Sequence, residues 1–155
     1  MAEHIEKKVR KLSYGVYIIG AEADGRLNGM TAAWVSQVSE FPPMVSVCID
    51  ASHYTSEMIE KSRAFSVNVL SEKHFDLAMK CGFGSGRNTQ RLKDVEIEYK
   101  LTGSPIIKGA AAFMDCELRQ IIDIGDGRLF IGEVVASGEN DLPGMKFDAK
   151  RFFDR

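Results

Sequence analysis

Residues 28–43 read NGMTAAWVSQVSEFPP, and this stretch carries the main signals for how the chain folds. It begins with Asn28-Gly29, a dipeptide that favours a two-residue hairpin turn. Residues 30–39 are then expected to form a strand. Pro42 and Pro43 end it, because a proline has no backbone N–H to donate to a sheet. The stretch therefore predicts a hairpin, a strand and a break before the next strand.

The strand over 30–39 carries unusually little bulk at its start. Thr31, Ala32 and Ala33 precede Trp34. Small residues in a strand often mark a place where a ligand or another backbone comes close, so a flat ring could lie against them. The alternative is tight packing beneath a helix, with Trp34 as an ordinary core aromatic residue.

Strand patterns recur on both sides of this stretch. Residues 14–23 are rich in β-branched and aromatic side chains and lead into a second turn dipeptide, Asp24-Gly25. Residues 44–50, MVSVCID, alternate apolar and other side chains as a strand does. Further strands are expected at 64–70, near residue 98, within 109–124 and at 128–138.

Two short helices are expected among these strands. Thr55 is placed to be the N-cap of a helix over 55–62, and Ser71 the N-cap of one over 72–80. Six or seven closely spaced strands with two or three short helices favour a mostly β fold. An antiparallel barrel suits this pattern better than a doubly wound parallel sheet.

The composition is that of one soluble domain over residues 1–155, with 45% hydrophobic and 27% charged residues. The net charge is −2 and the two signs are mixed along the chain, so nucleic acid is not expected as a partner. No apolar stretch is long enough to span a bilayer and no signal-peptide pattern is present. A cytoplasmic protein without a membrane partner is expected.

Cysteine and histidine spacings suggest neither a disulfide framework nor a metal site. Cys48, Cys81 and Cys116 lie far apart, and the three histidines lack the spacing of metal ligands. No Ser-His-Asp or Cys-His arrangement can be assembled from them. No catalytic side chain and no metal ligand is therefore assigned.

Two segments could bind an anion. Residues 81–88, CGFGSGRN, lack the strand-then-helix context of a dinucleotide fingerprint, but offer backbone N–H groups and Arg87. Ser52, Tyr54 and Thr55 lie at an expected helix start, where phosphate binds readily. The alternatives are a flexible connection for the first segment and ordinary helix capping for the second.

Taken together, these stretches resemble the flavin reductase-like family, whose members have the FMN-binding split-barrel fold. The matching stretches are 13–50, the Ser52/Thr55 segment with its helix, 64–70, GSPII at 103–107 and LFIGEV at 129–134. The likeness covers roughly residues 9–137 and looks closest to the short ferric reductase and rubredoxin-associated branch.

The resemblance implies a bound FMN and a set of residues around it. Thr31, Ala32, Ala33 and Trp34 would lie at the isoalloxazine ring, and Cys48, Ile49 and Asp50 would line its edge. Ser52 and Thr55 would hold the 5′-phosphate, while Gly82, Phe83 and Arg87 would close over the phosphate or the ring. Members of the family are typically homodimers with the flavin near the subunit interface.

One departure from the family pattern concerns the electron donor. Many members carry G-D-H before the L-F-x-G-E-V strand, and the histidine lies near the site of the nicotinamide. This chain has Gly127 at that position, followed by Arg128. Arg128 is interpreted as a solvated turn residue, with contact to a dinucleotide phosphate as the alternative.

Three functions are weighed on this basis. The first is an FMN-dependent oxidoreductase that takes electrons from NAD(P)H and passes them to free flavin, ferric iron or a small redox protein. The second is a non-enzymatic, flavoredoxin-like electron-transfer protein reduced by a protein donor. The third is a barrel that binds haem or pyridoxal phosphate. The sequence offers no iron-ligating arrangement and no lysine in the small-residue strand, which argues against both ligands.

The C-terminal stretch 144–155 mixes Phe147, Phe152 and Phe153 with basic residues. We expect it to pack over a partner subunit in a dimer. Contact with an acidic redox partner is the alternative.

Overall fold

The computed structural model describes residues 8–153 of the chain. The strands are β1 (Tyr17–Ala23), β2 (Arg26–Ala32), β3 (Val35–Ser39), β4 (Met44–Asp50), β5 (Ala64–Val69), β6 (Ile97–Glu98), β7 (Ile106–Ile107), β8 (Ala112–Ile124) and β9 (Gly127–Glu139). The helices are α2 (Tyr54–Ser62), the 3-10 helix η1 (Glu72–His74), α3 (Phe75–Gly82) and α4 (Ala149–Phe153).

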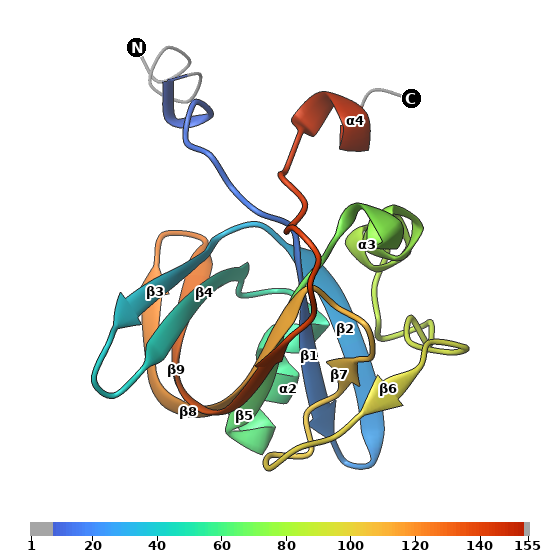
Figure 1. The fold of residues 1–155 in the computed structure, drawn as a ribbon. Coiled ribbons are helices and arrows are strands. Elements are labelled where there is room, and N and C mark those ends of the chain that lie inside the picture. The colour runs from blue at the N-terminus through green and yellow to red at the C-terminus, as the bar shows by residue number, and fades with distance from the viewer. Residues whose placement is uncertain (1–7, 154–155) are drawn as a thin grey trace.

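Seven strands form one antiparallel sheet in the order β2-β1-β5-β8-β9-β4-β3, which wraps into a barrel (Figure 1). Strands β2 and β3 are the two edges of this sheet. They are nevertheless consecutive in the chain, since β2 ends at Ala32 and β3 begins at Val35. The barrel is therefore left open between two consecutive strands, and the predicted split β-barrel is confirmed.

The core has two parts, because side chains alternate between the two faces of each strand. One cluster fills the barrel and includes Ile19, Phe65 and Phe130, all fully buried. The other lies on the outer face of β1, where Ile18 packs with Met79 of α3. Strand β1 is thus covered on both faces, and α3 is held beside β2.

The hairpin turn lies at Asp24-Gly25, and the prediction of a turn at Asn28-Gly29 was wrong. Asp24 and Gly25 both have positive φ, 55° and 76°, as a type I′ hairpin turn requires. The β1–β2 register then runs without interruption from Ala23 opposite Arg26 to Tyr17 opposite Ala32. Asn28-Gly29 has the right composition for a turn, but it lies inside β2.

The predicted strand over 30–39 is two strands. The chain leaves one edge of the sheet at Ala32 and joins the other edge at Val35. Of the small residues that weaken the strand pattern, Thr31 and Ala32 end β2 and Ala33 lies in the crossing between the edges.

The N-cap assignments had mixed outcomes. Helix α2 begins at Tyr54 with His53 as its N-cap residue and has no side-chain cap, so the assignment of Thr55 was wrong. The Thr55 hydroxyl instead accepts a hydrogen bond from Asn28. Ser71 does precede a helix, and it forms a capping box with His74, although the first turn is the 3-10 helix η1.

The C-terminal aromatic residues pack mainly within the chain itself. Phe152 is 4% exposed and contacts the rings of Phe75 and Phe147, with centroid distances of 5.2 and 5.4 Å. The expectation that this stretch packs over a partner subunit is therefore wrong for Phe152, which belongs to the outer core cluster. Phe153 is 65% exposed.

We predict that Asp115→Ala strongly destabilises the fold. Asp115 is fully buried and accepts hydrogen bonds from the Leu101 and Thr102 amides, at 2.8 and 3.0 Å, and from the Thr102 hydroxyl. Removing a buried carboxylate with these partners should lower the free energy of unfolding by about 3 kcal/mol, measured by urea denaturation. Glu117→Ala, also in β8, removes only an exposed ion pair and should cost below about 1 kcal/mol. If both variants lowered the free energy of unfolding equally, the structural role assigned to Asp115 would be contradicted.

Candidate functional site

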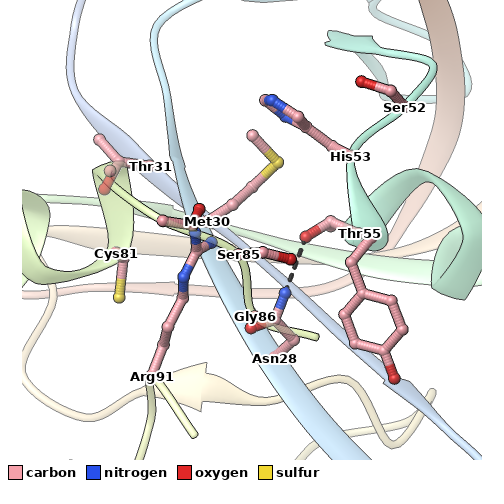
Figure 2. A pocket seen from close by; sticks show the side chains of 13 residues that line it. Asn28, Met30, Thr31, Ser52, His53, Thr55, Cys81, Ser85, Gly86 and Arg91 are labelled. Carbon is pink, nitrogen blue, oxygen red and sulfur yellow. Dashed lines mark hydrogen bonds between the residues drawn. The ribbon is translucent and has the colours of Figure 1, made fainter. Parts of the chain in front are cut away.

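A hollow of about 190 Å³ lies where β2, the start of α2 and the glycine-rich segment after α3 meet (Figure 2). Most of its lining groups are polar side chains, glycines and backbone. The lining residues are Asn28, Met30, Thr31, Ser52, His53, Tyr54, Thr55, Cys81, Gly82, Gly84, Ser85, Gly86 and Arg91. Three segments far apart in sequence thus build one polar site.

Asn28 connects the three segments. Its side chain is 1% exposed, and Nδ2 donates a hydrogen bond of 3.0 Å to Oγ1 of Thr55 on α2. Its Oδ1 has no hydrogen-bond partner within the described chain. Gly86 lies directly against the Asn28 amide, and a Cβ at Gly86 would overlap it. The glycine therefore lets the loop approach the strand this closely.

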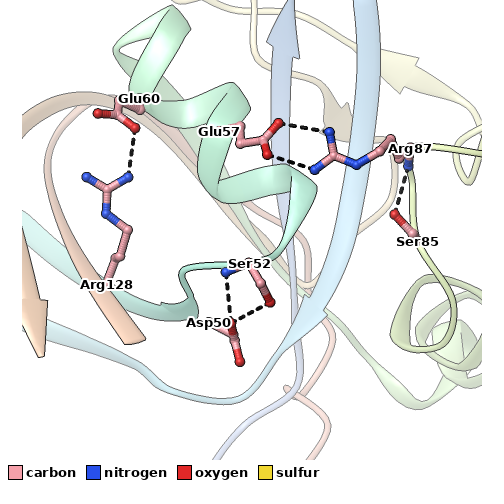
Figure 3. A network of polar contacts seen from close by, with 7 residues as sticks. All are labelled: Asp50, Ser52, Glu57, Glu60, Ser85, Arg87 and Arg128. Atoms are coloured by element: carbon pink, nitrogen blue, oxygen red, sulfur yellow. Dashed lines mark hydrogen bonds and ion pairs between the residues drawn. The ribbon is translucent and has the colours of Figure 1, made fainter. Parts of the chain in front are cut away.

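Arginine contacts hold the glycine-rich loop, residues 83–88, against both β2 and α2. Arg26 donates to the carbonyl oxygens of Gly86 and Arg87, at 2.7 and 2.6 Å. Arg87 in turn forms two hydrogen bonds to the Glu57 carboxylate, at 3.0 and 2.8 Å (Figure 3). The same guanidinium lies 4.8 Å from the centre of the Tyr54 ring. The Arg87 hydrogen bond lowers the pKa of Glu57 below its ordinary value of 4.5.

Arg91 binds the start of the same loop through hydrogen bonds to its carbonyl groups. The side chain lines the hollow, and the residue is only 7% exposed. Its guanidinium donates to the carbonyl oxygens of Gly29, Phe83 and Gly84, so it joins β2 to the loop. Its Nε is buried without a hydrogen-bond partner within the described chain.

The structure brings four of the predicted site residues into the hollow: Thr31, Ser52, Thr55 and Gly82. Arg87 and Phe83 belong to the adjacent loop but do not line the hollow. Thr31 is held in place by its hydroxyl, which donates to the Ala78 carbonyl of α3 at 2.6 Å.

The other predicted site residues lie outside the hollow. Ala32 is the last residue of β2, Ala33 and Trp34 form the crossing between the sheet edges, and Trp34 is 59% exposed. The Ile49 side chain is buried in the barrel core, so only its backbone can face a ligand.

Cys48 and Asp50 lie on β4 beside the start of α2. Burial, and secondarily the negative charge of Asp126, raises the pKa of the Cys48 thiol. Asp50 accepts hydrogen bonds from the hydroxyl and the amide of Ser52, at 2.7 and 2.8 Å, and these bonds lower the pKa of Asp50. Gly127 faces Cys48, since a Cβ at Gly127 would lie 3.1 Å from Sγ.

Sequence reasoning missed several of the residues that line the hollow. These include Asn28, Met30, His53 and Arg91, whereas Ser85 and Gly86 lie within the predicted anion-binding segment 81–88. Asn28 was interpreted as part of a turn, which hid its role. The sequence around Arg91 has no motif that indicates a binding residue. Only the tertiary fold brings Arg91 into contact with the loop.

Arg128 was interpreted as a solvated turn residue, and this was wrong. It lies in β9 with 18% of its side chain exposed, and it pairs with Glu60 of α2 at 2.8 Å and with Asp123 at 3.1 Å. Arg128 therefore ties β9 and β8 to α2.

We predict that Glu57→Gln loosens the glycine-rich loop without unfolding the protein. Losing the charged partner of Arg87 should raise amide hydrogen exchange over residues 84–89 several-fold, since the loop is otherwise held mainly through carbonyl groups. Glu60→Gln breaks an ion pair on the same helix and should leave this exchange unchanged.

The same contact has a definite pH dependence. Because the folded-state pKa of Glu57 is lowered, the contribution of the Arg87 contact is present above the unfolded pKa. It is lost as the pH falls through the lowered folded value. Relative to the intrinsic exchange rate at each pH, the protection of the loop amides should therefore stay constant in Glu57→Gln over this range, whereas in the unmodified protein it should fall as the pH falls. Equal acid responses would contradict the role of Glu57.

The sequence matches the family described as "Flavin reductase like domain" over residues 9–153. A ferric-chelate reductase (NAD(P)H) of Archaeoglobus fulgidus is 32% identical over 127 residues, covering 81% of this chain and 75% of that protein. A high molecular weight rubredoxin of Moorella thermoacetica is 32% identical over 130 residues, covering 83% of this chain. This chain spans only 57% of that rubredoxin's length.

Among solved structures, an FMN-binding protein from Thermus thermophilus superposes with a TM-score of 0.78 at 30% identity. The alignment covers 83% of this chain and 72% of that one. Within residues 8–153 no helix has the length and apolar character needed to cross a membrane. The family match spans nearly the whole chain and agrees with the split barrel described above, so the chain belongs to the flavin reductase-like family.

Proposed function

We propose that this chain is an FMN-binding oxidoreductase that passes electrons from NAD(P)H through the bound flavin to free flavin, ferric iron or a small redox protein. The observation that carries the proposal is the polar hollow beside the small-residue crossing between β2 and β3. Membership of the flavin reductase-like family supports it. The name of the ferric-chelate reductase relative supports NAD(P)H as donor and ferric iron as acceptor.

The size of the hollow suits one part of a flavin nucleotide. Its volume of about 190 Å³ is below the roughly 300–1,000 Å³ of pockets that enclose a drug-sized ligand. A phosphate and a polyol chain fit such a space, and a tricyclic ring would lie outside it. The unpartnered Oδ1 of Asn28 is matched by a hydroxyl donor of a polyol chain.

The ring would then lie along the crossing. Thr31, Ala32 and Ala33 leave room for it, and Trp34 offers an exposed aromatic surface. Because β2 and β3 are edge strands, part of their backbone N–H and C=O groups is not used by the sheet and can meet the polar edge of a ring. The backbone of Cys48, Ile49 and Asp50 would lie at the ring's edge. Ser52 and Thr55 would hold the phosphate, with Gly82, Phe83 and Arg87 closing over it.

The chemistry that a bound flavin would supply is to accept hydride and pass on electrons. The chain's own residues bind it, orient its ring and shield it. Glu57 and Arg87 close the loop side of the hollow, while Asn28 fixes β2 against α2. This division of roles requires no general acid or base from the side chains that line the hollow.

A homodimer with FMN near its interface completes the proposal. Trp34, Val38 and Phe41 are 59%, 51% and 89% exposed and lie on β3 and at its two ends. A cluster of exposed apolar side chains on a sheet edge suits an interface. Trp34 belongs both to this cluster and to the proposed ring site. A cytoplasmic location, where the free thiols Cys48, Cys81 and Cys116 stay reduced, accords with this reading.

A second candidate is an electron-transfer protein reduced by another protein. Gly127 favours it, because the family resemblance places a histidine there, near the nicotinamide site. A Cβ at that position would lie 3.1 Å from Cys48 Sγ, so this chain packs the position tightly. The name of the rubredoxin relative supports a small redox protein as the partner.

We predict that the purified protein reconstituted with FMN is reduced by NADH or NADPH. In an anaerobic cuvette the oxidised-flavin absorption should disappear at a turnover-scale rate, roughly 1 per second or faster. If FMN binds but is reduced only by a chemical reductant, the electron-transfer function replaces the reductase. Failure of any flavin to bind would overturn both.

A further inference from the structure

Arg91 is a buried cation without a counter-charge. Within residues 8–153 it forms no ion pair, whereas Arg87, Arg119, Arg128 and Arg151 each pair with a carboxylate. Its partners are three neutral carbonyl groups, and its Nε has none among the described residues. Burial lowers the pKa of Arg91, which reflects the cost of placing this charge away from water. A buried charge is costly unless an opposite charge compensates it.

Among the described residues, the lining that Arg91 shares holds no carboxylate, although Asp50 accepts hydrogen bonds from Ser52, one of the lining residues. Helix α2 points its start at the hollow through Ser52, His53 and Thr55, and it has no side-chain cap. The N–H groups of Tyr54 and Thr55 and the positive end of the helix dipole therefore remain for a ligand, while the Ser56 N–H is bonded to the His53 carbonyl.

The second independent sign of a ligand is the Asn28 amide. Asn28 is only 1% exposed, and its Oδ1 has no hydrogen-bond partner within the described chain. An unpaired buried acceptor in the same hollow as an uncompensated cation calls for a ligand that offers both a hydroxyl donor and an anion. A phosphorylated polyol has these two groups side by side.

Arg87, which the family resemblance places over the phosphate or the ring, is a weaker source of charge. Its guanidinium is held by both oxygens of Glu57, so the pair is nearly neutral. Arg87 therefore acts mainly to hold the loop in place, and of these two arginines only Arg91, which lines the hollow, keeps an uncompensated charge.

We propose that Arg91 is the residue that makes this site select a phosphate monoester, so that the chain holds FMN in preference to riboflavin. This inference rests on the proposed function, because it concerns the flavin assigned to the hollow. The Arg91 charge is balanced only when the phosphate is present, and the Asn28 acceptor is satisfied by a neighbouring hydroxyl.

The test compares equilibrium binding of FMN and riboflavin, followed by quenching of flavin fluorescence. The unmodified protein should bind FMN at least about tenfold more tightly, since one hydrogen bond to a charged group contributes that much. Arg91→Met should remove most of this preference by weakening FMN while leaving riboflavin within about threefold. Arg91→Lys should retain part of it, because the charge is kept.

Two further variants separate charge from structure. Arg128→Met removes a paired arginine outside the hollow and should leave the FMN to riboflavin ratio unchanged. Arg87→Met should weaken both flavins by a similar factor, since it only releases the loop. If Arg91→Met weakens both flavins equally, or if Arg87→Met abolishes the preference instead, the proposal is overturned.

One measurement needs no variant and so does not depend on how a substitution at a buried site folds. Inorganic phosphate should raise the apparent dissociation constant of FMN for the unmodified protein by more than twofold and leave that of riboflavin unchanged. Equal binding of both flavins, insensitive to phosphate, overturns the role of Arg91 alone. Binding of neither flavin overturns the proposed function as well.

Discussion

The crossing of the chain from one sheet edge to the other at Ala33 and Trp34 is the constraint on which the rest of the structure depends. Two consecutive strands normally pair, and here they instead end the sheet on opposite sides of the barrel opening. The crossing itself is partly exposed, since Ala33 is half-buried and Trp34 is 59% exposed. It also leaves backbone groups of β2 and β3 unused at the place where the polar hollow begins.

The hollow is built from contacts that no single segment could make. Asn28 of β2 reaches Thr55 of α2, and Gly86 of the loop lies against the Asn28 amide. Arg26 and Arg91 then hold the loop by its carbonyl groups. The arginines thus serve two purposes, since Arg87 is neutralised by Glu57 while Arg91 keeps its charge beside the hollow.

Local patterns predicted most of the strands because alternation and turn residues act over a few positions. They misplaced the hairpin turn, since Asp24-Gly25 and Asn28-Gly29 have nearly equal turn propensity. Only the pairing of β1 with β2 and β5 decides between them. The same limit explains Thr55, whose hydroxyl suits a cap but accepts a hydrogen bond from Asn28 of another element.

The sequence by itself determined the mostly β fold and the split barrel, and it singled out Thr31, Ser52, Thr55 and Gly82, which the structure brings together at one hollow. Those conclusions follow from side-chain alternation, turn composition and a family resemblance spread over the chain. The tertiary structure alone decided which charges remain available. Whether an arginine is paired or buried depends on contacts between distant segments, as Glu57 with Arg87 and the loop carbonyls with Arg91 show. Such contacts leave no trace in local sequence, because burial and ion pairing are set by the packing of the whole chain.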